Sequence, residues 1–442
     1  MERSMKRSLR RIVLGIAIFA GAALGAQARA YAGQIPEGWT ASNMRPIGYS
    51  DLDGRGGAFK LAIRQVNGRW YLYMGHLWHR GWSIVDVTDP ANPKFVKFIP
   101  GPDNTWTIQM ELHDNIMITA LQSFSPSWGG DPSKPNNEGA LIWDISDPVN
   151  PKLLSHWRTG GRGVHRVGYP GGKYMNVAAG MPGYTGQILV FVDISDPKNP
   201  KEAGRWWLPG QKDGEPRTGP VGSLHGPAFI DGTKAYLGYG PSVVILDIAD
   251  ISSPKLVGRL DFSPPFGGLV VHDVLLIPGR NLLYAHGEGT GDGCTALYLD
   301  GMVDIKDPKA PRFLSQFPLP EPPKDAPFTS FCDKGGRFGP HNTNLEYHLP
   351  DVEKQGDLIY DTYFNAGLRI YNIKNARLPK ETGWFVPPTP PKRMGPIPEG
   401  KLVTQVEDVL VDTRGNIYIT DKQWGLWVLR YTGPGQPAPT AK

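Results

Sequence analysis

The sequence predicts an all-β protein, a seven-bladed β-propeller closed by an N-terminal strand. Three observations lead to this prediction: the composition, a motif that recurs along the chain, and a last repeat that is cut short. The 442 residues include 55 Gly and 43 Pro. Such a content without a collagen period is typical of a β-rich protein with many turns.

The recurring motif combines an apolar run, an Asp-Pro turn or a variant of it, and a second run after Pro-Lys or Pro-Arg. Six copies occupy residues 81–96, 140–154, 188–204, 242–258, 301–314 and 368–383. Apolar and β-branched runs bounded by turn residues predict strands. The copies lie about 50 to 70 residues apart, which is the length of one four-stranded propeller blade with variable loops.

The last repeat, residues 425–433, ends before its Asp-Pro turn. Residues 45–49 resemble the fourth strand predicted at 255–259. We therefore expect the N-terminal segment to complete the last blade, which closes the ring and removes free sheet edges. This arrangement predicts one propeller domain over residues 33–435 and a disordered tail over 436–442.

The repeats resemble those of the LVIVD-repeat family, which are bacterial, secreted β-propellers. The resemblance covers roughly residues 45–433 and rests on cores such as VDISDP at 192–197. It implies the propeller fold. It implies no particular chemistry, because these cores belong to outer strands and a fold does not define a function.

The N-terminus has the form of an export signal. Basic residues including Arg3 and Lys6 precede an apolar run from Ile12 to about Leu24, followed by small residues suited to cleavage. We interpret residues 1–32 as a signal peptide, with the general secretory route and the twin-arginine route both open. The mature protein is then expected in the periplasm or outside the cell.

Charge excludes two classes of partner. The whole formal charge of +5 falls within residues 1–32, so the mature chain is close to neutral. Neither a nucleic acid nor an anionic membrane surface is expected as partner, and no later segment is apolar enough to span a bilayer. A small-molecule substrate remains.

The chain has two cysteines, Cys294 and Cys332. An oxidising compartment allows them to form one disulfide, and free thiols or metal ligation are the alternatives. Both lie in segments expected on the same face of the propeller, so we predict that they pair.

Four histidines occupy the same position in consecutive blades, at the start of the predicted innermost strand: His165, His225, His272 and His341. Glu407 takes this position in the last blade. Innermost strands line the axis of a propeller, so these side chains are expected to converge. The alternative is a repeated packing feature between blades.

Neutral imidazoles suit transition metals, so the four histidines predict a metal centre, with iron or copper favoured and zinc possible. The arrangement resembles, at the level of the fold, the four axial histidines that hold iron in carotenoid-cleaving oxygenases. That resemblance implies carboxylates behind the ligands, for which Glu407, Asp273 and Glu288 are candidates.

Three further histidines, His76, His79 and His286, follow second strands that run back to the same face. Together with Glu407 they are expected to line the pocket as acid–base or orienting groups. The sequence thus predicts a periplasmic metal-dependent oxidoreductase acting on a small organic molecule. A metal-assisted hydrolase or lyase and a non-catalytic binding scaffold are the alternatives.

Overall fold

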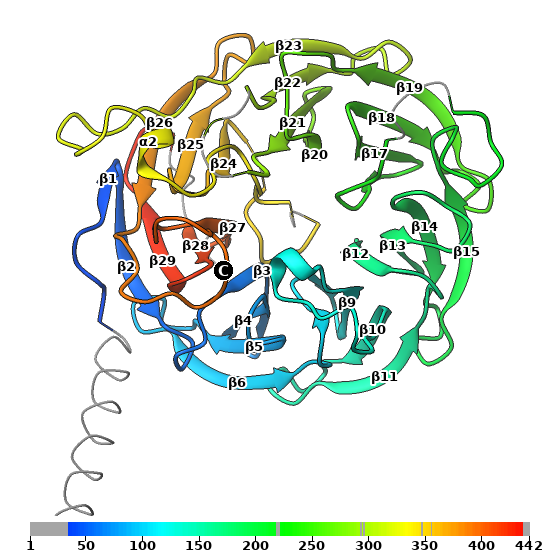
Figure 1. Cartoon of the computed structure of the whole chain (residues 1–442), viewed down its shortest axis with the longest axis horizontal. Helices are drawn as coiled ribbons and strands as arrows, with labels where there is room; N and C mark the ends of the chain where they lie inside the picture. Colours follow the sequence, from blue (N-terminus) through cyan, green and yellow to red (C-terminus); the bar gives the residue numbers. More distant parts are fainter. Residues whose placement is uncertain are drawn as a thin grey trace, which may run out of the picture.

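The computed structural model describes residues 34–217, 222–291, 294, 297–345, 348–354 and 356–435. The predicted signal peptide, residues 1–32, and the predicted tail, residues 436–442, lie outside these described residues. Antiparallel sheets follow one another around a central axis, with the innermost strands next to it (Figure 1). The prediction of an all-β propeller is confirmed.

The blades follow chain order, and their strands are given from the axis outwards. Blade 1 contains β3 (Ala58–Val66), β4 (Arg69–His76), β5 (Gly81–Asp86) and β6 (Lys94–Pro100). Blade 2 contains β8 (Met110–His113), β9 (Ile116–Ser123), β10 (Gly139–Asp144) and β11 (Lys152–Trp157). Blade 3 contains β12 (Gly163–Gly168), β13 (Tyr174–Gly180), β14 (Ile188–Asp193) and β15 (Lys201–Trp206). Blade 4 contains β16 (Phe229–Asp231), β17 (Lys234–Tyr239), β18 (Ser242–Asp247) and β19 (Lys255–Asp261). Blade 5 contains β20 (Leu269–Ile277), β21 (Leu282–Glu288), β22 (Asp300–Asp304) and β23 (Arg312–Gln316). Short β7 (Thr105–Trp106) adds to β9, a 3-10 turn spans Pro126–Trp128, and helix α2 spans Phe331–Lys334.

The last two blades use strands from both ends of the chain. Blade 6 contains β24 (Leu358–Thr362), β25 (Leu368–Asn372), β26 (Lys380–Val386) and, outermost, β1 (Thr40–Ser42); blade 7 contains β27 (Val406–Val411), β28 (Asn416–Asp421), β29 (Gly425–Tyr431) and β2 (Met44–Ser50). Strand β2 pairs with β29 from Met44 opposite Tyr431 to Ser50 opposite Leu426. The predicted closure by the N-terminal segment is confirmed.

The Asp-Pro motif forms the same turn in successive blades. The carboxylate of Asp144, at the end of a third strand, accepts a hydrogen bond from the backbone N–H of Ser146, and Asp193 does the same for Ser195. A short acidic side chain that bonds the backbone two residues on stabilises a turn locally. The repeat therefore specifies the crossing from the third strand to the fourth.

Neighbouring blades pack closely at one point of the fourth strand. A Cβ atom on Gly204 of β15 would lie 1.9 Å from the backbone oxygen of Ile251, and one on Gly258 of β19 would lie 2.1 Å from that of Pro308. These distances are far below van der Waals contact, so only glycine allows the turn after the third strand of the next blade to pack there.

The disulfide prediction is confirmed: Cys294 and Cys332 are bonded, with a Cα–Cα distance of 5.3 Å. The bond ties the loop after β21 to helix α2, in the insertion before the innermost segment of blade 6. Among the described residues, no helix has the length and apolar character that a membrane crossing needs.

Candidate functional site

The innermost strands carry β-bulges at the positions of the predicted site. In β12, Val164 pairs with Ala179 and Arg166 pairs with Ala178, so His165 is the extra residue. In β27, the extra residue is Glu407 in the same way. A bulge interrupts the alternation of side chains and redirects them. Consecutive residues, such as His165 and Arg166, can therefore both reach the axis.

The structure brings His165, His225, His272 and His341 together. The Nε2 atoms of His165 and His225 lie 2.9 Å apart. Successive ring centroids around the cluster lie 4.4, 4.2 and 4.9 Å apart, from His165 through His225 and His272 to His341. We call these four residues the histidine cluster.

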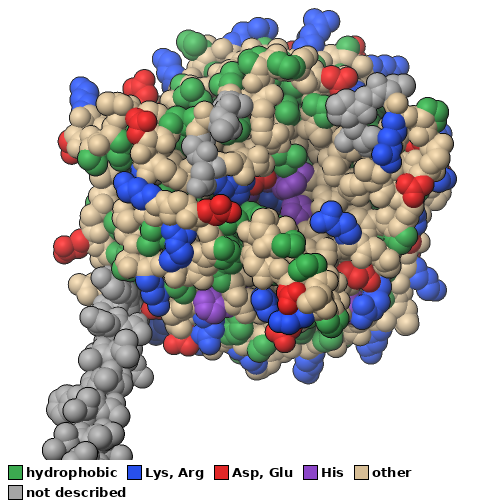
Figure 2. All heavy atoms as spheres, viewed as in Figure 1, with side chains coloured by type: hydrophobic (Ala, Val, Ile, Leu, Met, Phe, Trp, Pro, Cys, Tyr) green, Lys and Arg blue, Asp and Glu red, His purple; other side chains and the backbone are tan. Residues whose placement is uncertain are grey.

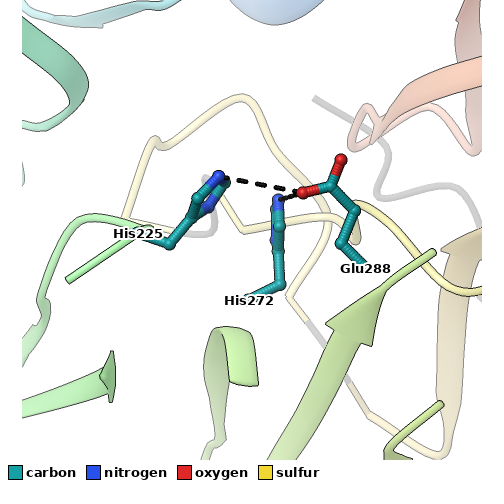
Figure 3. Close-up of side chains that lie close together, drawn as sticks. All are labelled: His225, His272 and Glu288. Atoms are coloured by element: carbon teal, nitrogen blue, oxygen red, sulfur yellow. Dashed lines mark ion pairs between the residues drawn. The ribbon is translucent and has the colours of Figure 1, made fainter. Parts of the chain in front are cut away.

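Glu288, the last residue of β21, lies among these rings. Its carboxylate oxygens are 3.8, 3.6 and 3.8 Å from the Nε2 atoms of His225, His272 and His341. Figure 3 shows the imidazoles of His225 and His272 facing this carboxylate. The sequence suggested Glu288 for a position behind the ligands. In the structure, its carboxylate instead faces the same point as three of the rings.

A buried cation holds Glu288 in its charged form. Arg337 forms an ion pair with the carboxylate and also donates from Nε to the backbone oxygen of Gly289, at 2.6 Å. Burial opposes ionisation, but Arg337 and the neighbouring groups lower the pKa of Glu288 to about 2. The site thus contains a permanent negative charge among neutral rings.

Two of the rings, those of His165 and His341, are oriented by hydrogen bonds through Nδ1, whereas Nδ1 of His272 lies close to a carboxylate without forming a hydrogen bond. The Nδ1 atom of His165 is 2.7 Å from Oε1 of Gln122, that of His272 is 2.9 Å from Oδ2 of Asp273, and that of His341 is 2.9 Å from the backbone oxygen of Glu407. If Nδ1 carries the proton, Nε2 has a free lone pair, as a metal-ligating histidine requires.

The four imidazoles are neutral near pH 7. Burial is the largest cause, and it lowers the pKa of each ring of the histidine cluster well below 6.5. Neighbouring imidazoles and Arg166 act in the same direction. Neutral imidazole is the form that binds transition metals, so the protonation state fits a metal ion.

Arg166 stands directly beneath the cluster. Its Nη2 atom is 2.8 Å from Nε2 of His272, and its Nη1 atom bonds Asp273 at 3.2 Å and Asn342 at 3.0 Å. A Cβ atom on Gly226 would lie 1.5 Å from Oδ1 of Asp273, so any other residue there would displace this carboxylate. In this arrangement Arg166 competes for the lone pair of His272.

Glu407 lies behind His341. It is fully buried, forms an ion pair with Lys422, and has its other oxygen 3.2 Å from Nδ1 of His341. Burial, opposed by Lys422, raises its pKa to about 7. This position lets Glu407 orient and polarise the ring of His341.

The remaining predicted pocket residues separate into two groups. His286 is near the cluster, with its ring centroid 5.5 Å from that of His272 and 5.1 Å from that of Tyr284. His76 instead bonds Oγ of Ser83 through Nε2 at 2.7 Å, and His79 bonds a backbone oxygen within blade 1 at 3.3 Å. The structure does not bring His76 and His79 to the histidine cluster.

Access to the cluster is from one face. Figure 2 shows histidine side chains in a hollow at the centre of this face, with charged side chains around it. The side chains of His225 and Glu288 are 17% and 12% exposed, whereas those of His272 and His341 are 0% and 2% exposed. A molecule that enters from this face meets His225 and Glu288 first.

Several residues at the site were missed from the sequence, and they include Gln122, Lys422, Arg166, Asn342 and Arg337. Arg166 and Asn342 each follow a histidine of the cluster by one residue. Comparing the residue after each of these histidines across the blades would have found them. Arg337 lies in the insertion before blade 6, outside any repeat, and no sequence signal identifies it.

Fold and site together define a β-propeller with a buried histidine–carboxylate cluster on its axis. Two segments, residues 172–206 and 230–261, match the family model of the LVIVD repeat, and they cover most of blades 3 and 4. The protein is a β-propeller that contains LVIVD repeats in these two segments. A search of curated proteins found no match.

Solved structures resemble this chain at the level of the fold. The periplasmic gluconolactonase PpgL of Pseudomonas aeruginosa matches 86% of this chain and 98% of its own, with a TM-score of 0.52 and 11% identity. A protein from Lactobacillus plantarum matches 85% of this chain and 96% of its own, with a TM-score of 0.48 and 10% identity. At such identity the first likeness shows a shared propeller fold alone.

Proposed function

We propose that the protein is an exported, periplasmic metalloenzyme that acts on a small molecule at the histidine cluster. Its metal ion would be held by His165, His225, His272 and His341, with Glu288 beside it. The observation that carries the proposal is the approach of one carboxylate to three neutral imidazoles, at 3.6–3.8 Å from their Nε2 atoms.

The donor set agrees with a transition metal. Imidazole nitrogens suit iron, copper and zinc, and the carboxylate offsets part of the charge of a divalent ion. The hydrogen bonds of His165 to Gln122 and of His341 to the Glu407 carbonyl are typical of metal-ligating histidines. Hydrogen bonding of Arg166 to His272 opposes the ion, so loading requires this guanidinium to turn away.

The reaction class we favour is oxidation or reduction of a small organic molecule, with iron or copper as the metal. Such a metal supplies electron transfer or the activation of a bound oxidant. The chain's own residues would admit substrate past His225 and Glu288, and Arg337 would hold Glu288 in place. Glu407 and His286 would orient the cluster from behind it.

A metal-assisted hydrolase is the second candidate. Arg166 and Arg337 bring two cationic side chains to the cluster, and cations of this kind stabilise the negative charge that develops on oxygen during hydrolysis. The fold neighbour named as a gluconolactonase is consistent with this class, although the likeness extends only to the fold.

Metal analysis of the mature protein tests the proposal. We expect one iron, copper or zinc ion per chain, lost in His165→Ala, His225→Ala, His272→Ala and His341→Ala. His156→Ala is the matched control, because His156 lies on the outer strand β11 and its ring bonds the backbone oxygen of Glu138. Reconstitution with zinc or with iron or copper then separates hydrolysis from redox chemistry. Metal-free protein with unaffected variants would leave a binding scaffold as the function.

A further inference from the structure

A second cavity lies further along the channel, below the layer formed by Arg166 and Asp273. It has a volume of about 70 Å³. The strand β12 passes from His165 at the cluster to Gly168 at this cavity, which corresponds to roughly 10 Å along the axis. None of the four residues of the histidine cluster lines it.

Two hydrogen-bond donors on its wall lack partners. Nε2 of Gln109 and Nε of Arg166 are buried without an acceptor among the described residues, and both side chains are 2% exposed. A buried donor without an acceptor is costly and indicates a missing partner. Whatever fills the cavity should therefore present acceptor atoms.

Two cationic side chains also line the cavity, each with a carboxylate beside it. Lys60, which is 3% exposed, lines it together with Arg166, and its Nζ atom is 3.9 Å from Oδ2 of Asp408. The acids on the wall have partners of their own, because Asp273 pairs with Arg166 and Glu111 lies 3.8 Å from Nε2 of His348. In the described part of the chain, each of the two carboxylates that line the cavity thus has a basic side chain beside it.

Apolar side chains form another part of the wall. They include Val167, Phe229, Val274 and Leu345. A ligand with an acidic head and a short hydrocarbon body would satisfy both parts of the wall, since apolar surface favours burial of methylene groups. The cavity, at about 70 Å³, is several times larger than the roughly 10–15 Å³ that one water molecule needs.

We propose that this cavity is a binding site for the carboxylate of a small aliphatic acid, separate from the histidine cluster. The carboxylate accepts hydrogen bonds from Gln109 and Arg166 and lies near the ammonium group of Lys60. The hydrocarbon chain contacts Val167, Phe229 and Leu345. The site does not depend on a metal ion.

Calorimetric titration of metal-free protein, kept in a chelator, tests this proposal. The probes are acetate, propionate and butyrate, with propionamide, butyramide and inorganic phosphate as comparisons. We expect saturable binding of the acids, about fourfold tighter for each added methylene until the cavity is filled. The uncharged amides should bind at least about tenfold more weakly than the acids.

Gln109→Glu keeps the shape of the side chain and places a negative charge where the ligand carboxylate would lie. It should weaken acid binding at least about tenfold, as should Lys60→Met. Gln187→Glu is the matched control, since this half-buried glutamine lies before β14 and does not line the cavity. Circular dichroism and unfolding curves of each variant verify that it is folded.

Several results would overturn the proposal: no saturable heat at roughly 50 mM acid, equal affinity for acids and amides or for phosphate, or binding that Gln109→Glu leaves unchanged. Crystals soaked with butyrate give a direct check, because density at the histidine cluster instead of beside Gln109 would also refute it. Loss of the metal proposal would leave all these measurements unaffected.

Discussion

Arg166 donates a hydrogen bond of 2.8 Å to Nε2 of His272, the nitrogen that faces the carboxylate of Glu288. The same guanidinium bonds Asp273 and Asn342. One arginine thus separates the histidine cluster from the lower cavity and occupies a nitrogen that a metal ion would need. Two opposite effects follow from its removal.

Arg166→Met should raise metal affinity and lower stability. Freeing the His272 lone pair and removing a cation should tighten zinc binding by about tenfold or more. Loss of its main cationic partner should leave Asp273 poorly compensated and cost about 3 kcal/mol of unfolding free energy. Chelator competition and urea unfolding measure the two effects.

The double variant Arg166→Met/Asp273→Asn serves as a control, because it removes the uncompensated charge as well. We expect it to recover much of the lost stability and to keep the tighter zinc binding. Zinc affinity that is unchanged or weaker in Arg166→Met would show that the arginine does not compete with the ion.

His76 should make stability depend on pH. Burial lowers its folded-state pKa to about 3, whereas the unfolded chain titrates near 6.5. Below pH 6.5 the unfolded state binds a proton that the folded state does not, so stability falls as the pH decreases. This one group contributes about 1.4 kcal/mol per pH unit until the pH approaches its folded pKa.

Urea unfolding of metal-free protein between pH 7.5 and 4.5 measures this slope. The lower end of this range lies about two pH units below the pKa of the unfolded chain. His76→Gln, whose amide can still bond Ser83, should reduce the slope by one proton. Above pH 7 the curves of variant and wild type should run parallel. An undiminished slope in the variant would assign the pH dependence to other groups.

The parts of the site that recur in the repeats could be predicted from the sequence. His165, His225, His272 and His341 share one position in successive blades, so the propeller geometry alone brings them together. Blade 1 contributes no histidine to the cluster; instead the ring of Phe59 lies 5.5 Å from that of His341. Lys60 lies in the next layer, near Asp408.

The parts that depend on loops and bulges could not be predicted. Second strands were expected to bring His76, His79 and His286 to the same place, yet only His286 arrives near the cluster. Glu288 reaches the centre because Arg337, from an insertion, holds it there. Sequence spacing defines strands, but it does not define how a bulge or an insertion directs one side chain.

The disulfide should contribute to stability. Cys294 and Cys332 are separated by 38 residues, and a bond across such a loop restricts the unfolded chain. Cys294→Ser/Cys332→Ser should lose about 2–4 kcal/mol of unfolding free energy. Urea unfolding checks this, and wild-type protein in reductant should behave like the double variant. Equal stability of oxidised and reduced protein would contradict it.

Glu288→Gln tests the charge at the centre of the cluster. The substitution preserves the shape of the side chain and removes the anion that lies 3.6–3.8 Å from three Nε2 atoms. A divalent ion among neutral rings should lose about 10- to 100-fold in affinity, because this charge offsets part of its own. Chelator competition with zinc measures the change.

Glu381→Gln is the control for that experiment. Glu381 also pairs with a buried arginine, Arg369, but it lies in blade 6 on strand β26. Both variants leave an arginine without its anion, so both should lose comparable stability as metal-free proteins. Only Glu288→Gln should lose zinc affinity. A similar loss in both variants would mean that the effect comes from weakened packing, and an unchanged affinity in Glu288→Gln would remove the carboxylate from the metal site.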